Sequence, residues 1–516
     1  LKLRKMPGAR ADDGSDRPRP HTSGYIRTSD LDDLHPQLIY GALLIFLNAV
    51  GRSLLVVAPV ALSWRVLAPV AFALAVLYLF LPLGVLGIAV LFCELAFNIK
   101  LRLTRRRLQR VKPSWQRLPA PSGARDVFLR TLRLVEEVES WSAPRGPGRT
   151  AKQWLEGWFL GTPLAEIRRG NMQDFIAWAW FTKYPAELEE GEQSTALEML
   201  QEMEKRFGWS FEDGHNPAIK PIRINFDTMS VWCHPLVYYA ALYALRASTR
   251  QTMRLFGFTY HAGRAGGISF FHKPARKPPG MLVLGGEAVT EKAEVPVVFF
   301  HGLGVGLPPY LLFIRRLATG RECFIVELPE VSQAGTETVL SPEVMAAEVA
   351  AMLQAHGHGR ACIVAHSYGT FVLSWVLRCR PDVVEKVVLI DPVNMLLSQP
   401  DVAYNFLYRR PNNPFTLVVA NFVRWELFSA NVLMREFYWY HNVLWLEDLP
   451  AGSLVVLAGD DDILNAQVVR RHIEEQQRRE AAAGCGARVR LLYMPGFFHG
   501  EVLVSRHAQM QMLQLF

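Results

Sequence analysis

From about residue 267 onwards, short apolar runs alternate with stretches of helical character, and this rhythm restricts the fold more than any other feature of the sequence. The predicted strands are GISFF, VVFF, CFIVE, ACIVA, VVLI, SLVVLA and VRLLYM, and predicted helices include 341–357, 370–380 and 465–482. Strands that alternate with helices form a mostly parallel sheet with helices on both faces. Functional residues of such sheets lie at the carboxyl ends of the strands. We therefore predict an α/β fold with its chemistry at those ends.

The predicted strand ACIVA is followed by the letters HSYG (366–369), and a helical stretch begins at once. Two small residues, Ala365 and Gly369, lie two positions on either side of Ser367. A sharp turn from strand to helix has no room for larger side chains at these places, and it lifts the serine hydroxyl above the sheet. Ser367 is therefore the candidate nucleophile.

This small-x-Ser-x-Gly pattern resembles the nucleophile turn of the α/β-hydrolase superfamily, with alanine at a place more often held by glycine. The resemblance covers about 255–516 and implies an α/β-hydrolase fold with the chain order serine, acid, histidine. His499 in FFHG is the implied base, and Asp462 in GDDD is the implied acid. Asp391 in LIDP is the alternative acid, since some relatives carry it one strand earlier. His507 is a weaker alternative base because its segment reads as helical.

The loop HGLG after VVFF resembles the loop that completes the oxyanion hole in this superfamily. The implied donors are the backbone N–H groups of Leu303 and Tyr368. The residues that support these motifs are His301, Gly302, Gly304, His366 and Gly369. We expect His366 to pack or to hydrogen bond rather than to act as the base. Because HGLGVG lacks the full spacing of a dinucleotide fingerprint, we predict no cofactor, and we predict no metal ion.

An insertion at about 393–450 separates two predicted strands, at a place where the superfamily commonly carries a cap. It contains twelve Phe, Trp and Tyr residues. Such a density is expected of a packed helical cap, and a cover over a hydrophobic acyl chain would have the same composition. Together with a membrane anchor, the insertion favours an ester of a lipid as substrate.

The N-terminal part of the chain is predicted to lie in a membrane. Residues 66–93 carry no charge, and about 20 apolar residues suffice to cross a bilayer. A second apolar stretch, 38–64, is interrupted by Arg52, so the sequence is compatible with one span or with two. The basic segment 100–112 is expected on the cytoplasmic side, near anionic lipid head groups.

Charge is distributed unevenly along the chain. Residues 1–112 hold 16 Lys and Arg against 7 Asp and Glu, whereas the remainder holds 40 against 41. A near-neutral body without a basic stripe argues against nucleic-acid binding. We predict a disordered tail over 1–35, membrane segments with a basic flank over 36–112, a helical region of unknown role over 113–254 and the hydrolase domain over 255–516.

Together these features predict a membrane-anchored serine hydrolase that cleaves carboxylic esters of lipids through an acyl-enzyme. Its expected partners are the lipid substrate and the membrane, and the catalytic domain is expected to face the cytoplasm. The six cysteines show no short-spaced pairs, which fits a reducing compartment. Two alternatives stay open: an acyltransferase that uses the same serine, and a catalytically inactive scaffold with this fold.

Overall fold

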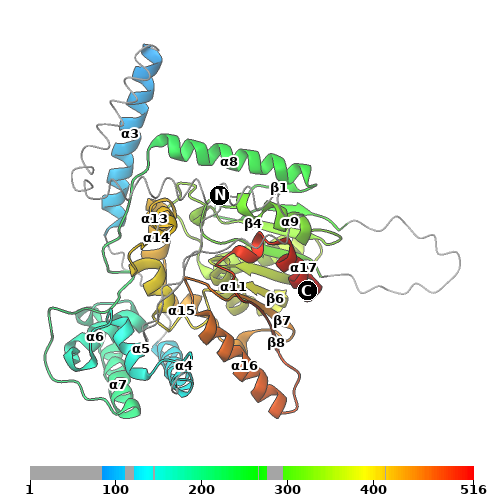
Figure 1. Cartoon of the computed structure of the whole chain (residues 1–516). Coiled ribbons are helices and arrows are strands. Elements are labelled where there is room, and N and C mark those ends of the chain that lie inside the picture. Colours follow the sequence, from blue (N-terminus) through cyan, green and yellow to red (C-terminus); the bar gives the residue numbers. More distant parts are fainter. Residues whose placement is uncertain are drawn as a thin grey trace, which may run out of the picture.

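The computed structural model describes residues 84–110, 121–142, 146–264, 266–275, 295–412 and 414–515. The predicted tail 1–35 and the apolar stretch 38–64 lie outside these residues, as does the apolar stretch 66–93 up to position 83. The described chain is built around one twisted sheet, with helices on both sides of it (Figure 1).

The sheet has eight strands in the order β1-β2-β4-β3-β5-β6-β7-β8. β1 pairs with β2 and β2 with β4 in antiparallel fashion, and all other neighbours are parallel. The mostly parallel sheet that the sequence predicts is therefore confirmed. The strands are β1 Thr259–His261, β2 Ser269–Lys273, β3 Val297–Phe300, β4 Cys323–Glu327, β5 Ala361–His366, β6 Val384–Ile390, β7 Ser453–Ala458 and β8 Val489–Met494.

Each face of the sheet is buried by its own set of helices. Successive side chains of a strand point to opposite faces, and accordingly Val298 and Phe300 belong to one apolar core while Val297 and Phe299 belong to another. The first core includes α10 (Pro342–Ala355), α11 (Gly369–Cys379) and α16 (Ala466–Ala482). The second includes α9 (Leu311–Leu317) and α17 (Arg506–Leu515). Burial on both faces explains why the central strands read as continuous apolar runs.

The insertion between β6 and β7 packs directly against the helices that precede the sheet. Trp154 and Trp158 each donate an Nε1 hydrogen bond to the carbonyl of Ser398, at 2.9 and 3.1 Å. From the insertion, Trp439 Nε1 donates to the carbonyl of Ala179 at 2.6 Å. The preceding helices are α4 Pro121–Ser140, α5 Ala151–Trp158, α6 Arg169–Phe181 and α7 Glu190–Phe207, and those of the insertion include α12 Asp401–Ala403, α13 Pro414–Val419, α14 Leu427–Met434 and α15 Trp439–Asn442.

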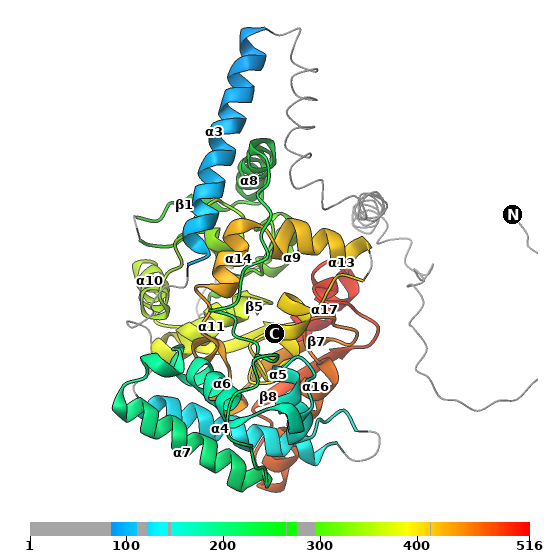
Figure 2. The ribbon, with the colours of Figure 1, turned by 90° about the vertical axis from the view of Figure 1, so that its left-hand side faces the viewer.

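Two long helices, α3 (Val85–Leu108) and α8 (Leu236–Leu255), lie on the side of the molecule opposite α4 to α7 (Figures 1 and 2). α3 projects away from the body. α8 runs along the side of the sheet domain where β1 lies (Figure 1). The two helices are joined where Phe97 packs edge-on against Tyr239, with ring centroids 5.4 Å apart. In addition, the amide of Leu236 donates to Glu94 Oε2 at 2.8 Å.

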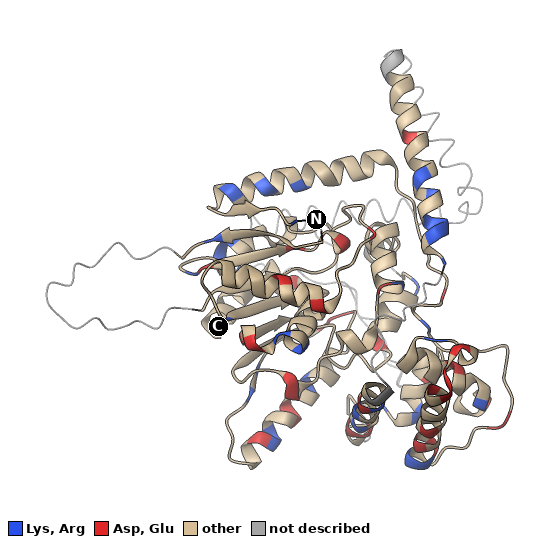
Figure 3. Ribbon diagram, turned by 180° about the vertical axis from the view of Figure 1, so that it is seen from behind, with Lys and Arg blue, Asp and Glu red and all other residues tan. Residues whose placement is uncertain are grey.

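Large apolar side chains of α3 face solvent. Ile88, Phe92, Leu95 and Leu103 are between 59% and 69% exposed. Lys and Arg gather along the C-terminal half of α3 and again near the end of α8 (Figure 3). Among the residues that the structure describes, no helix combines the length and the apolar character that a membrane span needs.

Candidate active site

Ser367 lies in the tight turn between β5 and α11, with a φ of 50°. A positive φ is strained for a serine, and such strain is typical of functional turns. The turn also brings Gly369 against β3: a Cβ at this glycine would lie 2.4 Å from the carbonyl oxygen of Phe300. A glycine is therefore required here by close packing, as the sequence pattern predicts.

A chain of hydrogen bonds starts at the serine hydroxyl. His499 Nε2 lies 2.9 Å from Ser367 Oγ, and His499 Nδ1 lies 2.6 Å from Asp461 Oδ2. The Asp461 side chain is fully buried. Its second oxygen, Oδ1, accepts the backbone N–H groups of Ile463 and Leu464 at 2.8 and 3.1 Å. These bonds hold the carboxylate in line with the imidazole.

The structure places Asp461, and not the predicted Asp462, in contact with His499. The side chain of Asp462 is 44% exposed and lies 3.6 Å from Arg409 Nη2. The same Arg409 nitrogen donates to the carbonyl of Asp462 at 2.9 Å. Because the turn over 461–464 directs adjacent side chains to different sides, only one of the neighbouring acids can reach the histidine.

The alternative acid, Asp391, is also near the histidine but is not its hydrogen-bond partner. It is fully buried, and its carboxylate accepts the amides of Ala458 at 2.8 Å and Gly500 at 2.7 Å. Asp391 thus joins the end of β6 to the end of β7 and to the loop that carries His499. Burial is the main reason why its pKa is raised to about 6.

The loop HGLG approaches the serine closely and is fixed by side chains. A Cβ at Gly302 would lie 3.0 Å from Ser367 Cβ and 2.9 Å from Tyr310 Oη. Tyr310 Oη accepts the amide of Gly302 at 2.9 Å and lies 2.9 Å from His366 Nδ1. His366 therefore forms a hydrogen bond, as we expected from the sequence. Tyr310, which connects the loop to the nucleophile turn, was not predicted.

Two further motif residues, His301 and Gly304, hold this loop in place through hydrogen bonds. His301 is fully buried, and its Nε2 accepts the amide of Leu328 at 3.1 Å. Burial lowers the pKa of His301 to about 4, so its ring is neutral. The amide of Gly304 donates to the carbonyl of Val331 at 3.0 Å. These contacts join the loop after β3 to the segment after β4.

An apolar cavity opens over the serine. Leu303 and Tyr368, the predicted oxyanion donors, line it together with Ser367. The insertion and α11 contribute most of the remaining wall, including Phe371, Leu397, Phe406, Leu407, Leu433, Phe437 and Trp439. Trp158 and Ile224 come from the helical region 113–254, and no motif in the sequence indicated their presence at this site.

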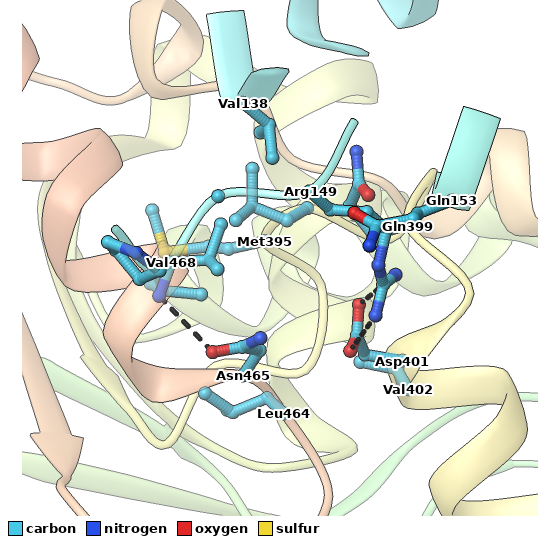
Figure 4. Close-up of a pocket in the computed structure, with 14 residues that line it drawn as sticks. Val138, Arg149, Gln153, Met395, Gln399, Asp401, Val402, Leu464, Asn465 and Val468 are labelled. Carbon is cyan, nitrogen blue, oxygen red and sulfur yellow. Dashed lines mark hydrogen bonds and ion pairs between the residues drawn. The ribbon is translucent and has the colours of Figure 1, made fainter. Parts of the chain in front are cut away.

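A second cavity adjoins the first, and Val402 of α12 lines both. Figure 4 shows the wall of this second cavity. Val138, Gln153 and Val468 contribute to it from α4, α5 and α16. At its rim, the two guanidinium nitrogens of Arg149 bind the two carboxylate oxygens of Asp401, each at 2.9 Å. This ion pair ties the start of the insertion to the helical region.

Comparison with known proteins agrees with the fold. Residues 295–468 match the family described as alpha/beta hydrolase fold. The domain has the α/β-hydrolase fold, which confirms the resemblance that the motifs indicated. A comparison with curated proteins found no match.

Several solved structures are similar at low identity. A bacterial membrane phospholipase A is 15% identical with a TM-score of 0.37, and the alignment covers 54% of this chain and 92% of that one. Carboxylesterase CesB of Bacillus subtilis is 10% identical, with a TM-score of 0.33 and coverage of 54% and 97%. A putative lipase of Acinetobacter baumannii is 13% identical, with a TM-score of 0.36 and coverage of 52% and 96%.

The carboxylates around His499 predict an alkaline pH profile for any reaction in which this histidine is the base. Burial lowers the pKa of His499, but the carboxylates of Asp461 and then Asp391 outweigh it and raise the pKa to about 9. A base must be unprotonated, so kcat/KM should rise with pH through this value. Asp391→Asn removes one nearby negative charge, destabilises the imidazolium and should move the midpoint down by roughly one pH unit.

The measurement is the pH dependence of kcat/KM for both forms, with thermal unfolding to verify that the variant is folded. Asp382→Asn, which alters a surface acid paired with Arg380 at 2.7 Å, is the control. A midpoint that stays in place in Asp391→Asn would contradict the electrostatic explanation.

Proposed function

We propose that this domain is a serine hydrolase that cleaves carboxylic esters. His499 accepts the proton of Ser367, the serine oxygen attacks the acyl carbonyl, and Asp461 stabilises the imidazolium. The N–H groups of Leu303 and Tyr368 bind the oxyanion. His499 then gives its proton to the alcohol as the ester C–O bond breaks, which leaves the acyl group on Ser367. Water, deprotonated by His499, attacks this acyl group, and the acid is released as the proton returns to Ser367. The observation that carries the proposal is the hydrogen-bonded chain from Ser367 through His499 to Asp461.

The proposal is tested by labelling with a fluorophosphonate, which reacts with activated serines. We expect the parent protein to be labelled and Ser367→Ala and His499→Ala to lose labelling. His507→Ala is the matched control, because His507 is an exposed residue of α17 and was the weaker candidate base. Absence of labelling in a folded parent protein would instead favour an inactive scaffold.

We further propose that the acyl group is hydrophobic, as in a lipid ester. The support is the cavity at Ser367, whose wall is almost entirely aliphatic and aromatic side chains. Apolar walls of this kind favour apolar ligands through burial of their surface. An ester series of increasing acyl length should show kcat/KM rising with length. Activity confined to short, water-soluble esters would contradict this substrate class, and product transfer to an added alcohol in preference to water would indicate an acyltransferase.

We also propose that the protein is anchored in a membrane, with the catalytic domain on the cytoplasmic side. The support is the uncharged stretch 66–93 and the basic residues of α3, which are typical of a cytoplasmic flank. α8 extends the membrane-facing surface, because Val237, Tyr243 and Leu255 on it are between 59% and 86% exposed. In this arrangement α8 would lie along the bilayer surface while the domain remains in water.

This arrangement predicts that position 243 contacts lipid. A polarity-sensitive fluorophore attached to Tyr243→Cys in membrane-reconstituted protein should be quenched by nitroxide-labelled lipid. The same fluorophore at Leu197→Cys is the control, because Leu197 is 47% exposed on α7, away from α8. Both variants need Cys93 and Cys485 replaced by serine, since these two native thiols are exposed. Equal quenching at the two positions would contradict the orientation, and release of the protein by alkaline carbonate would contradict the anchor.

A further inference from the structure

Three histidines from distant parts of the sequence meet at the antiparallel edge of the sheet. His261 ends β1, His272 lies in β2, and His356 directly follows α10. His261 pairs with Phe270 in the β1–β2 ladder, and His272, two residues further along β2, points to the same face. One ring nitrogen from each histidine lies within 4.8 Å of the others. All three residues are partly buried.

One ring nitrogen of His272 and one of His356 already have a partner within the protein. His356 Nδ1 lies 2.8 Å from the carbonyl of Met352, which places its proton on Nδ1 and leaves the Nε2 lone pair free. His272 Nε2 lies 2.8 Å from Glu322 Oε1, which leaves Nδ1 available. Hydrogen bonds from the outer nitrogen to a backbone carbonyl or a carboxylate are the usual second shell of metal-binding histidines.

The third ring is held by stacking. His261 packs parallel to Phe270, with centroids 4.7 Å apart and an interplanar angle of 5°. A neutral imidazole has a lone pair to offer a cation, whereas three imidazolium groups at these distances would repel each other.

We propose that His261, His272 and His356 bind one divalent transition-metal ion of the Zn²⁺ class, separate from the hydrolase site. Three imidazole nitrogens at about 2.0–2.1 Å from Zn²⁺ leave the fourth tetrahedral position to water. At that metal distance the nitrogens lie roughly 3.4 Å apart, so binding would draw together ring nitrogens that now lie within 4.8 Å of one another. The ion would join β1, β2 and the end of α10, and thus clamp the edge hairpin to the sheet.

The nearby charged groups are consistent with a cation at this place. Glu322 binds His272 through Oε1 and lies 3.2 Å from His358 Nε2 through Oε2. It therefore supplies one negative charge directly behind the ring of a ligand, which raises the basicity of that ligand. The long spacing of the three histidines along the chain explains why no metal motif was visible in the sequence.

A second group of metal-ligating side chains has to be distinguished in the test. Asp391, Asp461 and His499 also bring ligand atoms within 4.8 Å of one another. These residues already have protein partners in the candidate active site. His499→Ala removes that cluster and leaves the three-histidine site intact.

The experiment uses the full chain without an affinity tag, in detergent, with metal removed by chelation and Zn²⁺ then added. We expect one equivalent of Zn²⁺ to bind and to raise the melting temperature. His261→Gln and His356→Gln should each weaken binding about 10-fold or more, while His499→Ala and His215→Gln should bind as the parent does. His215 is the matched control because it is a surface histidine, 46% exposed and paired with Asp174.

Co²⁺ provides a second readout, because a tetrahedral site gives intense visible absorption that an octahedral aquo ion lacks. No binding by the parent protein, or equal binding by His261→Gln and His356→Gln, would overturn the proposal. Loss of binding in His499→Ala alone would assign the ion to the hydrolase site instead. Fluorophosphonate labelling of His356→Gln should be unchanged, so this inference and the proposed function can fail independently.

Discussion

Asp461→Asn is expected to lower kcat/KM for an ester substrate by about 10³- to 10⁴-fold. The Asp461 carboxylate lies 2.6 Å from His499 Nδ1 and is fully buried, so it sets the position of the ring and stabilises its charged form. An amide carries no charge, and its NH₂ group would favour the wrong tautomer of the histidine. The measurement is steady-state hydrolysis of one ester by the parent and the variant at several pH values.

Asp462→Asn is the matched control, because it makes the same chemical change one residue further along. The Asp462 side chain is directed at Arg409 and is 44% exposed. We expect its kcat/KM to stay within about threefold of the parent, as is usual for an exposed ion pair. The reverse result, a large loss in Asp462→Asn and a small one in Asp461→Asn, would restore the acid that the sequence pattern implies.

Gly369→Ala is expected to destabilise the protein by about 3 kcal/mol or more, enough to prevent accumulation of folded enzyme. The added methyl group would lie 2.4 Å from the carbonyl oxygen and 2.7 Å from the carbonyl carbon of Phe300. These atoms belong to the backbone of β3, which is paired on both sides with β4 and β5 and cannot move away. Thermal or urea unfolding of the two proteins provides the measurement.

Gly359→Ala is the control for the general effect of replacing glycine. A Cβ at Gly359 has nothing within 4 Å, and its φ is not in the left-handed region. The unfolded chain loses entropy in both variants, so any stability difference between them reports the contact at Phe300. If Gly369→Ala unfolded at the same temperature as Gly359→Ala, the close packing of the turn would be refuted.

The hydrolase fold was largely predictable because each central strand is buried on both faces. A strand such as β5 therefore has a continuous apolar sequence that ends where its functional residues begin. The alternation with helices then specifies a parallel sheet. The order of the strands was not predictable from these runs, because β4 lies between β2 and β3 through contacts that no local pattern encodes.

The candidate site was predictable to the extent that it depends on local turns. Ser367 and His499 each follow a recognisable strand, and the structure brings them within 2.9 Å. The acid was ambiguous because three aspartates are consecutive and the conformation of the loop decides which one turns inward. Backbone amides follow each of the three aspartates two and three residues further on, so the sequence holds no signal that singles out Asp461; only the structure shows that Ile463 and Leu464 donate to it.

The wall of the cavity has a consequence for how substrate range can diverge in such proteins. Trp158 and Ile224 touch the same space as Ser367 although they precede the matched hydrolase segment 295–468. Substitutions in that preceding region can therefore change the shape of this cavity while Ser367, His499 and Asp461 keep their identity. A change in what this cavity admits therefore need not leave a trace in the segment that the family match covers.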